Sequence, residues 1–186
     1  MKIAIIYHTA EGHTTEIARH IAERQRGAGY QVDVYRIEDA PDCLLGYAAA
    51  ILGGSVHMGR HDRSLVSYAK QHAGDLSTST SAFFSVSLSA AEGDDVNRAQ
   101  ADRCIHDFIE ETGWHPDLTG VFGGALLYTR YGFIKRKLMQ AISRRRGGPT
   151  DTTQDYDMTD WEAVEHFADD VVRLAEHQGE SQPAWD

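Results

Sequence analysis

Short apolar segments alternate along most of this chain with segments in which apolar residues recur every three or four positions. The first kind predicts five strands, at residues 2–7, 31–35, 47–52, 81–86 and 121–127. The second kind predicts amphipathic helices at residues 13–25, 65–73, 101–109 and 161–175. The segment 2–7 is apolar at every position after Lys2, which is typical of a strand buried on both faces of a parallel sheet.

Strands that alternate with helices in this way predict a doubly wound α/β domain, because right-handed crossovers place helices on both faces of a parallel sheet. The pattern fits one domain over residues 1–178, followed by a polar, flexible tail at 179–186. Residues 128–157 form an insertion before the last helix that is longer than an ordinary connection, and such insertions usually carry function. Thr159 and Glu162 have the spacing of a capping box at the start of that helix.

Composition narrows the class of protein. The 186 residues are 41% hydrophobic and 25% charged, which indicates a packed globular protein. No apolar run approaches the roughly 20 residues that cross a bilayer, and the N-terminus lacks a secretory signal pattern, so we expect a cytoplasmic protein. Cys43 and Cys104 share no metal-site spacing and are expected to be reduced and buried. We predict no metal site, and a net charge of −10 disfavours nucleic acid as a partner.

The segment between the first strand and the first helix, residues 9–15, is rich in threonine around Gly12. Threonine hydroxyls and backbone N–H groups at a helix N-terminus can bind a phosphate without a cationic side chain. A simple capped turn favours the same residue types, so both interpretations stay open at this point. The chain has no GxGxxG after the strand and no GxxxxGK[ST], which removes the main support for a dinucleotide-binding or P-loop site.

The Thr-x-x-Gly-x-Thr form of residues 9–14 resembles the first loop of the flavodoxin family, which wraps the phosphate of FMN. Residues 53–61, 83–88, 123–131 and 159–162 look like the flavodoxin-type, menaquinone-dependent protoporphyrinogen IX dehydrogenases. The resemblance runs from residue 2 to about residue 176, and its most specific part is the Gly-Ala-Leu-x-Tyr segment with the basic insertion. Some members carry an Arg-Tyr pair where this chain has His57 and Met58.

This resemblance implies a flavodoxin-like fold with FMN as cofactor, bound where loops converge at the switch point between the first and third strands. The implied FMN-binding residues are Thr9, Ala10, Glu11, Gly12, His13, Thr14 and Thr15 at the phosphate, Ser55, Val56, His57, Met58 and Gly59 beside the isoalloxazine ring, and Ser87, Leu88, Ser89 and Ala90 at its pyrimidine edge. His57 is the candidate catalytic residue, since an imidazole can exchange protons near neutral pH. Other loop histidines, such as His61, are expected to be solvated.

The insertion concentrates positive charge, with seven basic residues and no acidic one from Arg130 to Arg146. Its apolar residues share one helical face: Phe133, Ile134, Leu138, Ala141 and Ile142. This pattern predicts peripheral contact of residues 130–146 with an anionic membrane. Two alternatives stay open: the cations bind the propionates of a porphyrin, or the apolar face packs on the domain and the basic side faces solvent.

The resemblance implies oxidation of protoporphyrinogen IX to protoporphyrin IX in heme biosynthesis, with electrons passing from FMN to menaquinone or ubiquinone. The expected location is the cytoplasm, at the inner face of the cell membrane, and a homo-oligomer is compatible with the sequence. Two alternatives are an NAD(P)H:quinone reductase, which would consume NAD(P)H, and an electron-carrier flavodoxin, which would dock through an acidic surface.

Overall fold

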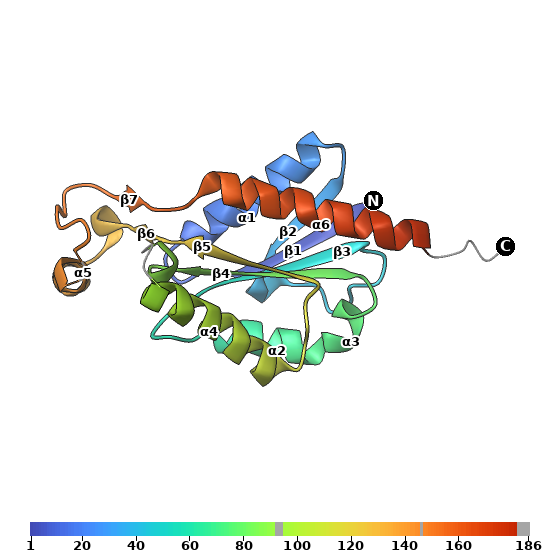
Figure 1. Ribbon diagram of the computed structural model, residues 1–186, viewed down its shortest axis with the longest axis horizontal. Helices are drawn as coiled ribbons and strands as arrows, with labels where there is room; N and C mark the ends of the chain where they lie inside the picture. The colour runs from blue at the N-terminus through green and yellow to red at the C-terminus, as the bar shows by residue number, and fades with distance from the viewer. Residues whose placement is uncertain (92–94, 146, 182–186) are drawn as a thin grey trace.

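The computed structural model describes residues 1–91, 95–145 and 147–181, and its centre is a five-stranded parallel sheet (Figure 1). The strands are β1 (Lys2–His8), β2 (Gln31–Arg36), β3 (Ala49–Ser55), β4 (Thr80–Ser87) and β5 (Leu118–Gly123). Their order is β2-β1-β3-β4-β5, so the chain crosses over β1 between β2 and β3. The predicted flavodoxin-like, doubly wound sheet is therefore confirmed.

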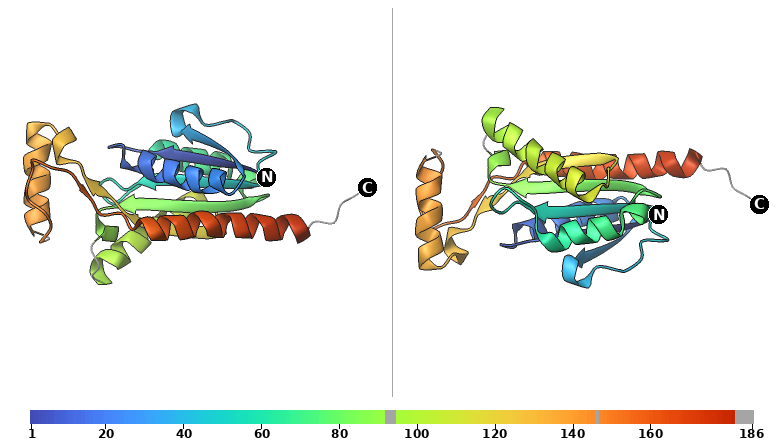
Figure 2. Two further views of the ribbon diagram at one scale, coloured as in Figure 1. Left: turned by 90° about the horizontal axis from the view of Figure 1, so that it is seen from above. Right: turned by 90° about the horizontal axis from the view of Figure 1, so that it is seen from below.

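Helices cover both faces of the sheet (Figures 1 and 2). One face is covered by α1 (His13–Gly27) and α6 (Trp161–Ser181), the other by α2 (Arg63–Gln71), α3 (Ala73–Leu76) and α4 (Asp95–Thr112). The described ranges also contain short 3₁₀ turns: η1 (Ile37–Asp39), η2 (Ser89–Ala91) and η3 (Tyr128–Arg130). In β1, Ile3 and Ile5 pack with α1 and α6 while Ala4 and Ile6 pack in the opposite core. Burial on both faces explains the unbroken apolar run of this strand.

The predicted fifth strand at 121–127 is wrong at both ends. β5 begins at Leu118 and ends at Gly123, and β6 (Ala125–Leu126) pairs antiparallel with β7 (Tyr156–Asp157) in a separate small sheet. Gly124 separates the two strands, since its N–H donates to the Ser87 carbonyl at 3.0 Å and its own carbonyl accepts from Met158 N–H at 3.2 Å. The apolar run therefore continues past Gly124, although the chain leaves the main sheet there, and the apolar pattern alone did not mark this change.

Two helix boundaries also differ from the predictions. The helix expected at 65–73 is interrupted at His72 and becomes α2 and α3. The last helix continues past 175 to Ser181, so residues 179–181 of the predicted flexible tail are helical, and residues 182–186 lie outside the described part of the chain.

The predicted capping box at the start of α6 is wrong. Asp160 caps this helix instead, because its Oδ1 accepts a hydrogen bond from Ala163 N–H at 3.0 Å. The Thr159 hydroxyl donates to the Gly123 carbonyl at 2.9 Å and lies 2.6 Å from His13 Nε2. The Thr159 hydroxyl is thus engaged in tertiary contacts, although the sequence spacing predicts that it caps α6.

The insertion is a folded lobe on the β6–β7 ribbon, containing η3 and α5 (Phe133–Arg145). It has its own small core, in which Leu126, Tyr128 and Tyr131 are buried with Met139 and Tyr156 packed against them. Figure 2 shows α5 standing beyond the carboxyl ends of the strands, across the direction of α6. Within the described ranges, no helix has both the length and the apolarity needed to span a bilayer.

Tight packing between β3 and β4 gives a direct test of the sheet. A Cβ at Gly53 would lie 2.0 Å from Cζ of the fully buried Phe84. We expect Gly53→Ala to lower the free energy of unfolding in urea by about 1–3 kcal/mol, because overpacked cores displace side chains or backbone. Gly74→Ala is the matched control, since nothing lies within 4 Å of a Cβ there. Equal stability of the two variants would contradict the packing described.

Candidate active site

A cavity of about 840 Å³ opens at the carboxyl edge of the sheet, beside the switch point between β1 and β3. Its walls come from the loops after β1, β3 and β4, from α4, and from α5 of the insertion. This volume lies in the range of sites for small molecules and cofactors. The three loops expected to converge therefore do so around one space.

The loop after β1 presents an open helix N-terminus. Gly12 has a φ of 99° and is the N-cap of α1, which has no side-chain cap. Its N–H donates to Thr9 Oγ1 at 2.9 Å, which tightens the loop. The first N–H groups of a helix have no intrahelical partner, so those of His13 and Thr14 are available to an anion. Together with the Thr14 side chain, which lines the cavity, this donor set fits a phosphate monoester.

The loop after β3 is a tight turn at the mouth of the cavity. The N–H and carbonyl groups of His57 and Arg60 hydrogen-bond to each other at 2.8 and 3.1 Å, and Met58 and Gly59 between them have φ values of 52° and 77°. Two positive φ angles are typical of a type I′ turn, which favours asparagine and glycine over methionine. Met58 nevertheless occupies this conformation with 91% of its surface exposed. The turn therefore holds an apolar side chain out over the cavity at some conformational cost.

Hydrogen bonds join the three loops. Ser55 Oγ accepts from Ala10 N–H at 3.3 Å, and Val56 N–H donates to the Val86 carbonyl at 2.8 Å. The loop after β4 is closed by Ser87, whose Oγ accepts from Ala90 N–H at 3.1 Å. These bonds fix the floor of the cavity without help from a ligand.

Most of the residues predicted at the site lie around it. The large cavity is lined by Thr9, Ala10, Glu11, His13, Thr14, Ser55, Val56, His57, Met58, Gly59, Ser87, Leu88 and Ser89. Gly12 and Thr15 line a smaller cavity of about 360 Å³ behind the first loop. Ala90 lines neither of these two spaces and contributes the backbone bond to Ser87.

Sequence reasoning missed two walls of the cavity. Gln100, Ala101 and Cys104 of α4 form one wall, and Gly124, Ala125, Lys135, Leu138, Met139 and Ile142 form the other. The apolar period of α4 showed only that Ala101 and Cys104 face inward. Such a period does not tell whether an inward-facing residue packs in a core or lines a cavity. The Cys104 thiol lies 3.6 Å from the Gly59 carbonyl, and burial raises its pKa.

Histidine exposure departs from the expectation for loop residues. His61 is buried, with Nε2 2.9 Å from Ser85 Oγ and its ring edge-on to Phe83 and Phe108. Burial lowers the pKa of His61 to about 4, so its imidazole is neutral at pH 7. His13 is also buried, whereas the catalytic candidate His57 is exposed.

The two cysteines are both free, as predicted, but only one is buried. Cys104 is buried at the cavity, whereas Cys43 is exposed, contrary to expectation. Cys43 lies in the connection between η1 and β3, where no apolar period constrains its side chain. The sequence pattern around Cys43 therefore carried no information about whether its side chain is buried or exposed.

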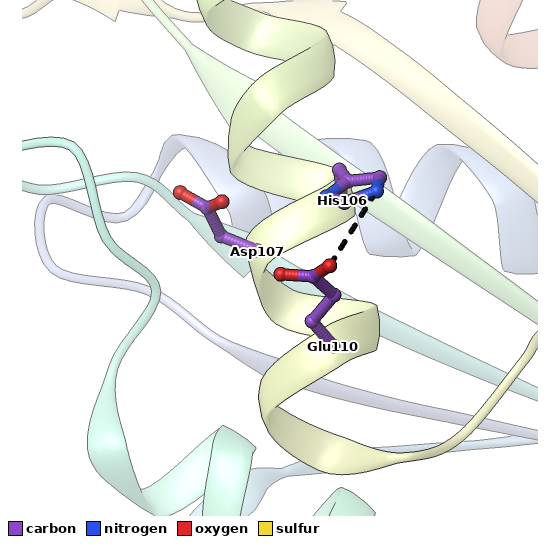
Figure 3. Close-up of side chains that lie close together, drawn as sticks. All are labelled: His106, Asp107 and Glu110. Carbon is purple, nitrogen blue, oxygen red and sulfur yellow. Dashed lines mark ion pairs between the residues drawn. The ribbon is translucent and has the colours of Figure 1, made fainter.

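One cluster of possible metal ligands lies on the surface of α4 (Figure 3). His106 Nε2 and Glu110 Oε1 are 3.8 Å apart, and Asp107 lies beside them. All three side chains are exposed, and the pair has the i,i+4 spacing common on helix surfaces. We assign no metal site to this cluster.

Comparisons with known proteins agree with this geometry. Residues 4–153 match the family model described as a flavodoxin domain. The chain is 39% identical over 178 residues to a protein of Leishmania major named protoporphyrinogen IX dehydrogenase (quinone), covering 93% of this chain and 75% of that protein. It is 33% identical over 179 residues to the protein of the same name from Escherichia coli strain K12, covering 95% and 97%.

Among solved structures, oxidised flavodoxin 1 from Bacillus cereus superimposes with a TM-score of 0.55. The match covers 93% of this chain and 98% of that protein at 19% identity. At this identity the likeness concerns the fold alone.

The buried imidazole of His61 predicts a pH dependence of stability. Its pKa is about 4 in the folded protein and near 6.5 when unfolded, so between these values the unfolded chain binds more protons. The free energy of unfolding should therefore fall by up to about 3 kcal/mol from pH 6.5 to pH 4. In urea titrations across this range, His61→Gln should show a shallower fall in the free energy of unfolding than wild type. Parallel curves for wild type and His61→Gln would contradict the assignment.

Proposed function

The chain belongs to the flavodoxin family and, within it, to the quinone-dependent protoporphyrinogen IX dehydrogenases, and from this membership we propose that it oxidises protoporphyrinogen IX to protoporphyrin IX. Its cofactor is FMN, as in other flavodoxins. The observation that carries the proposal is the single cavity joining the phosphate loop to an apolar wall supplied by the insertion. An electron carrier needs no such second wall around its flavin.

FMN supplies the redox chemistry when bound, since it can take two electrons from a reduced substrate and hand them to an acceptor. The chain would position it: the N-terminus of α1, with Thr9 and Thr14, would hold the phosphate. Residues 55–59 would contact the ring, and residues 87–90 would contact its pyrimidine edge. Each two-electron oxidation of a porphyrinogen releases protons, and the exposed His57 imidazole at the mouth can accept one and pass it to solvent.

The insertion provides the surface for a flat apolar substrate. Leu138, Met139 and Ile142 of α5 line the same cavity as Met58, and these apolar side chains would shield a tetrapyrrole or quinone in it from water. We propose a quinone of the menaquinone or ubiquinone type as acceptor, in line with the names of the relatives.

We further propose that the outer face of α5 rests on the inner surface of the cell membrane, where such quinones reside. Phe133 and Ile134 are 75% and 83% exposed. Lys137, Arg144 and Arg145 of the same helix are also exposed. Arg130 and Lys135 face Glu16 and Glu11 instead, and Arg146 lies outside the described residues. Apolar side chains ringed by cations are typical of interfacial helices.

The activity is tested by anaerobic reconstitution with FMN, followed by porphyrin fluorescence. Fluorescence should rise only when protoporphyrinogen IX, FMN-loaded protein and a quinone are all present, because the electrons need both a carrier and an acceptor. Omission of quinone is the control for spontaneous oxidation. Tight FMN binding without porphyrin formation would reject the substrate, and rapid NAD(P)H consumption with quinone would favour a reductase instead.

Membrane docking is tested by sedimentation with vesicles containing anionic lipid. Lys137→Gln with Arg145→Gln should weaken binding by about 2 kcal/mol, or roughly thirtyfold at low salt, because each cation near the surface contributes about 1 kcal/mol. Phe133→Ser with Ile134→Ser should weaken it at high salt as well. Arg19→Gln with Arg63→Gln removes the same charge from exposed positions on α1 and α2 and serves as control. Equal losses in the control pair would reject docking through α5.

A further inference from the structure

A carboxylate stands inside the loop that holds the phosphate. Glu11 lies between Ala10 and Gly12, one residue before the open N-terminus of α1. Its Oε1 is 2.7 Å from Lys135 Nζ, and its Oε2 accepts a hydrogen bond from the Tyr131 hydroxyl. Both partners belong to the insertion, more than a hundred residues away in the chain, so the Glu11 side chain joins the cofactor loop to the lobe that carries α5.

The same three side chains form a compact cluster, which we call the Glu11 clasp. Lys135 Nζ lies 4.8 Å from the centre of the Tyr131 ring, over its face. Tyr131 is buried, and its hydroxyl also accepts from Leu127 N–H at 3.3 Å. Burial, together with the hydrogen bond to Glu11, raises the pKa of Tyr131, which therefore remains a neutral donor at physiological pH. The clasp is thus a carboxylate held by one cation and one neutral donor.

Charge explains why the clasp matters to the cofactor. A phosphate monoester carries close to two negative charges at pH 7, and a bare carboxylate in the same loop would repel it. Lys135 cancels that repulsion when α5 is docked. The Glu11 and Lys135 side chains are 26% and 43% exposed, so their pairing adds little to folding stability. The main effect of the Glu11–Lys135 pair is therefore on the affinity for the anion that binds beside it.

We propose that Lys135 and Tyr131 neutralise and hold Glu11, so that docking of α5 and occupation of the loop by the FMN phosphate favour each other. Glu11 is then a positioning residue rather than a phosphate ligand, and the insertion acts on the cofactor without touching its phosphate. Coupling of this kind is reciprocal: if docked α5 strengthens FMN binding, bound FMN must stabilise docked α5 to the same degree. The inference rests on FMN binding but not on the identity of the substrate.

The test is a double-mutant cycle on the apoprotein, titrated with FMN and with riboflavin, which lacks the phosphate. Quenching of flavin fluorescence gives each dissociation constant. Lys135→Met should weaken FMN binding about tenfold or more and riboflavin binding less than twofold, because only the phosphate meets the uncompensated carboxylate. Glu11→Gln combined with Lys135→Met should return FMN affinity to within about threefold of wild type.

The control variant is Lys137→Met, which removes the same charge from the same helix. Lys137 is exposed and lines neither of the two cavities, so its loss should leave both affinities unchanged. If the double variant bound FMN as weakly as Lys135→Met does, the proposal would be overturned, since this would mean that Lys135 binds the phosphate directly. Equal weakening of FMN and riboflavin by Lys135→Met would overturn it as well. Failure of wild type to bind FMN would instead reject the cofactor.

Hydrogen exchange supplies a second readout, which wild type alone can contradict. At saturating concentrations, FMN should slow exchange of backbone amides in residues 133–145 more than riboflavin does, because the two share the ring and differ in the phosphate. In the Glu11→Gln, Lys135→Met protein this difference should vanish. Identical exchange with both flavins in wild type would contradict the coupling.

Discussion

An uncapped helix N-terminus at the carboxyl edge of a parallel sheet is the feature on which the site depends. Gly12 starts α1 with a φ of 99°, which other residues adopt only with strain, and leaves the first N–H groups without a side-chain partner. The helix dipole and these groups favour an anion at one fixed point. The parallel topology then brings the loops after β3 and β4 to the same edge. A ligand anchored by its phosphate at this point can extend into the large cavity between these loops.

The insertion uses the two sides of α5 differently. One flank closes the cavity, through Leu138, Met139 and Ile142, while Phe133 and Ile134 face outward. The lobe holds this orientation because it has a core of its own around Tyr128 and is hydrogen-bonded to the loops of the domain. A lobe placed in this way can shield a flavin on one side and meet a membrane on the other.

The fold could be predicted from sequence because it follows from local periodicity. The apolar run of β1 and the 3.6-residue period of α1 specify their elements without long-range information. The first-loop residues could be predicted for the same reason, since Gly12 and its threonines are a contiguous signal. Predictions failed where tertiary contacts decided: Thr159 bonds to His13 and Gly123 rather than capping α6, and Gly124 takes the chain out of the sheet within an apolar run.

The missed parts of the site share one cause. Leu138 and Ile142 were recognised as an apolar face, but periodicity does not say whether such a face meets a cavity, a core or a membrane. His61 was expected in solvent because it lies in a loop, whereas Phe83 and Phe108 from distant segments cover it. Glu11 was predicted to bind FMN, but its partners Tyr131 and Lys135 were missed, because most of the chain separates them from it.

The most direct test of the account is a crystal structure of the protein with FMN. We expect the phosphate within hydrogen-bond distance of the N–H groups at His13 and Thr14, with the ring between residues 55–59 and 87–90 and α5 above it. A phosphate in the smaller cavity beside Arg36 and Arg130, or a ring outside the space beneath α5, would contradict the central claim.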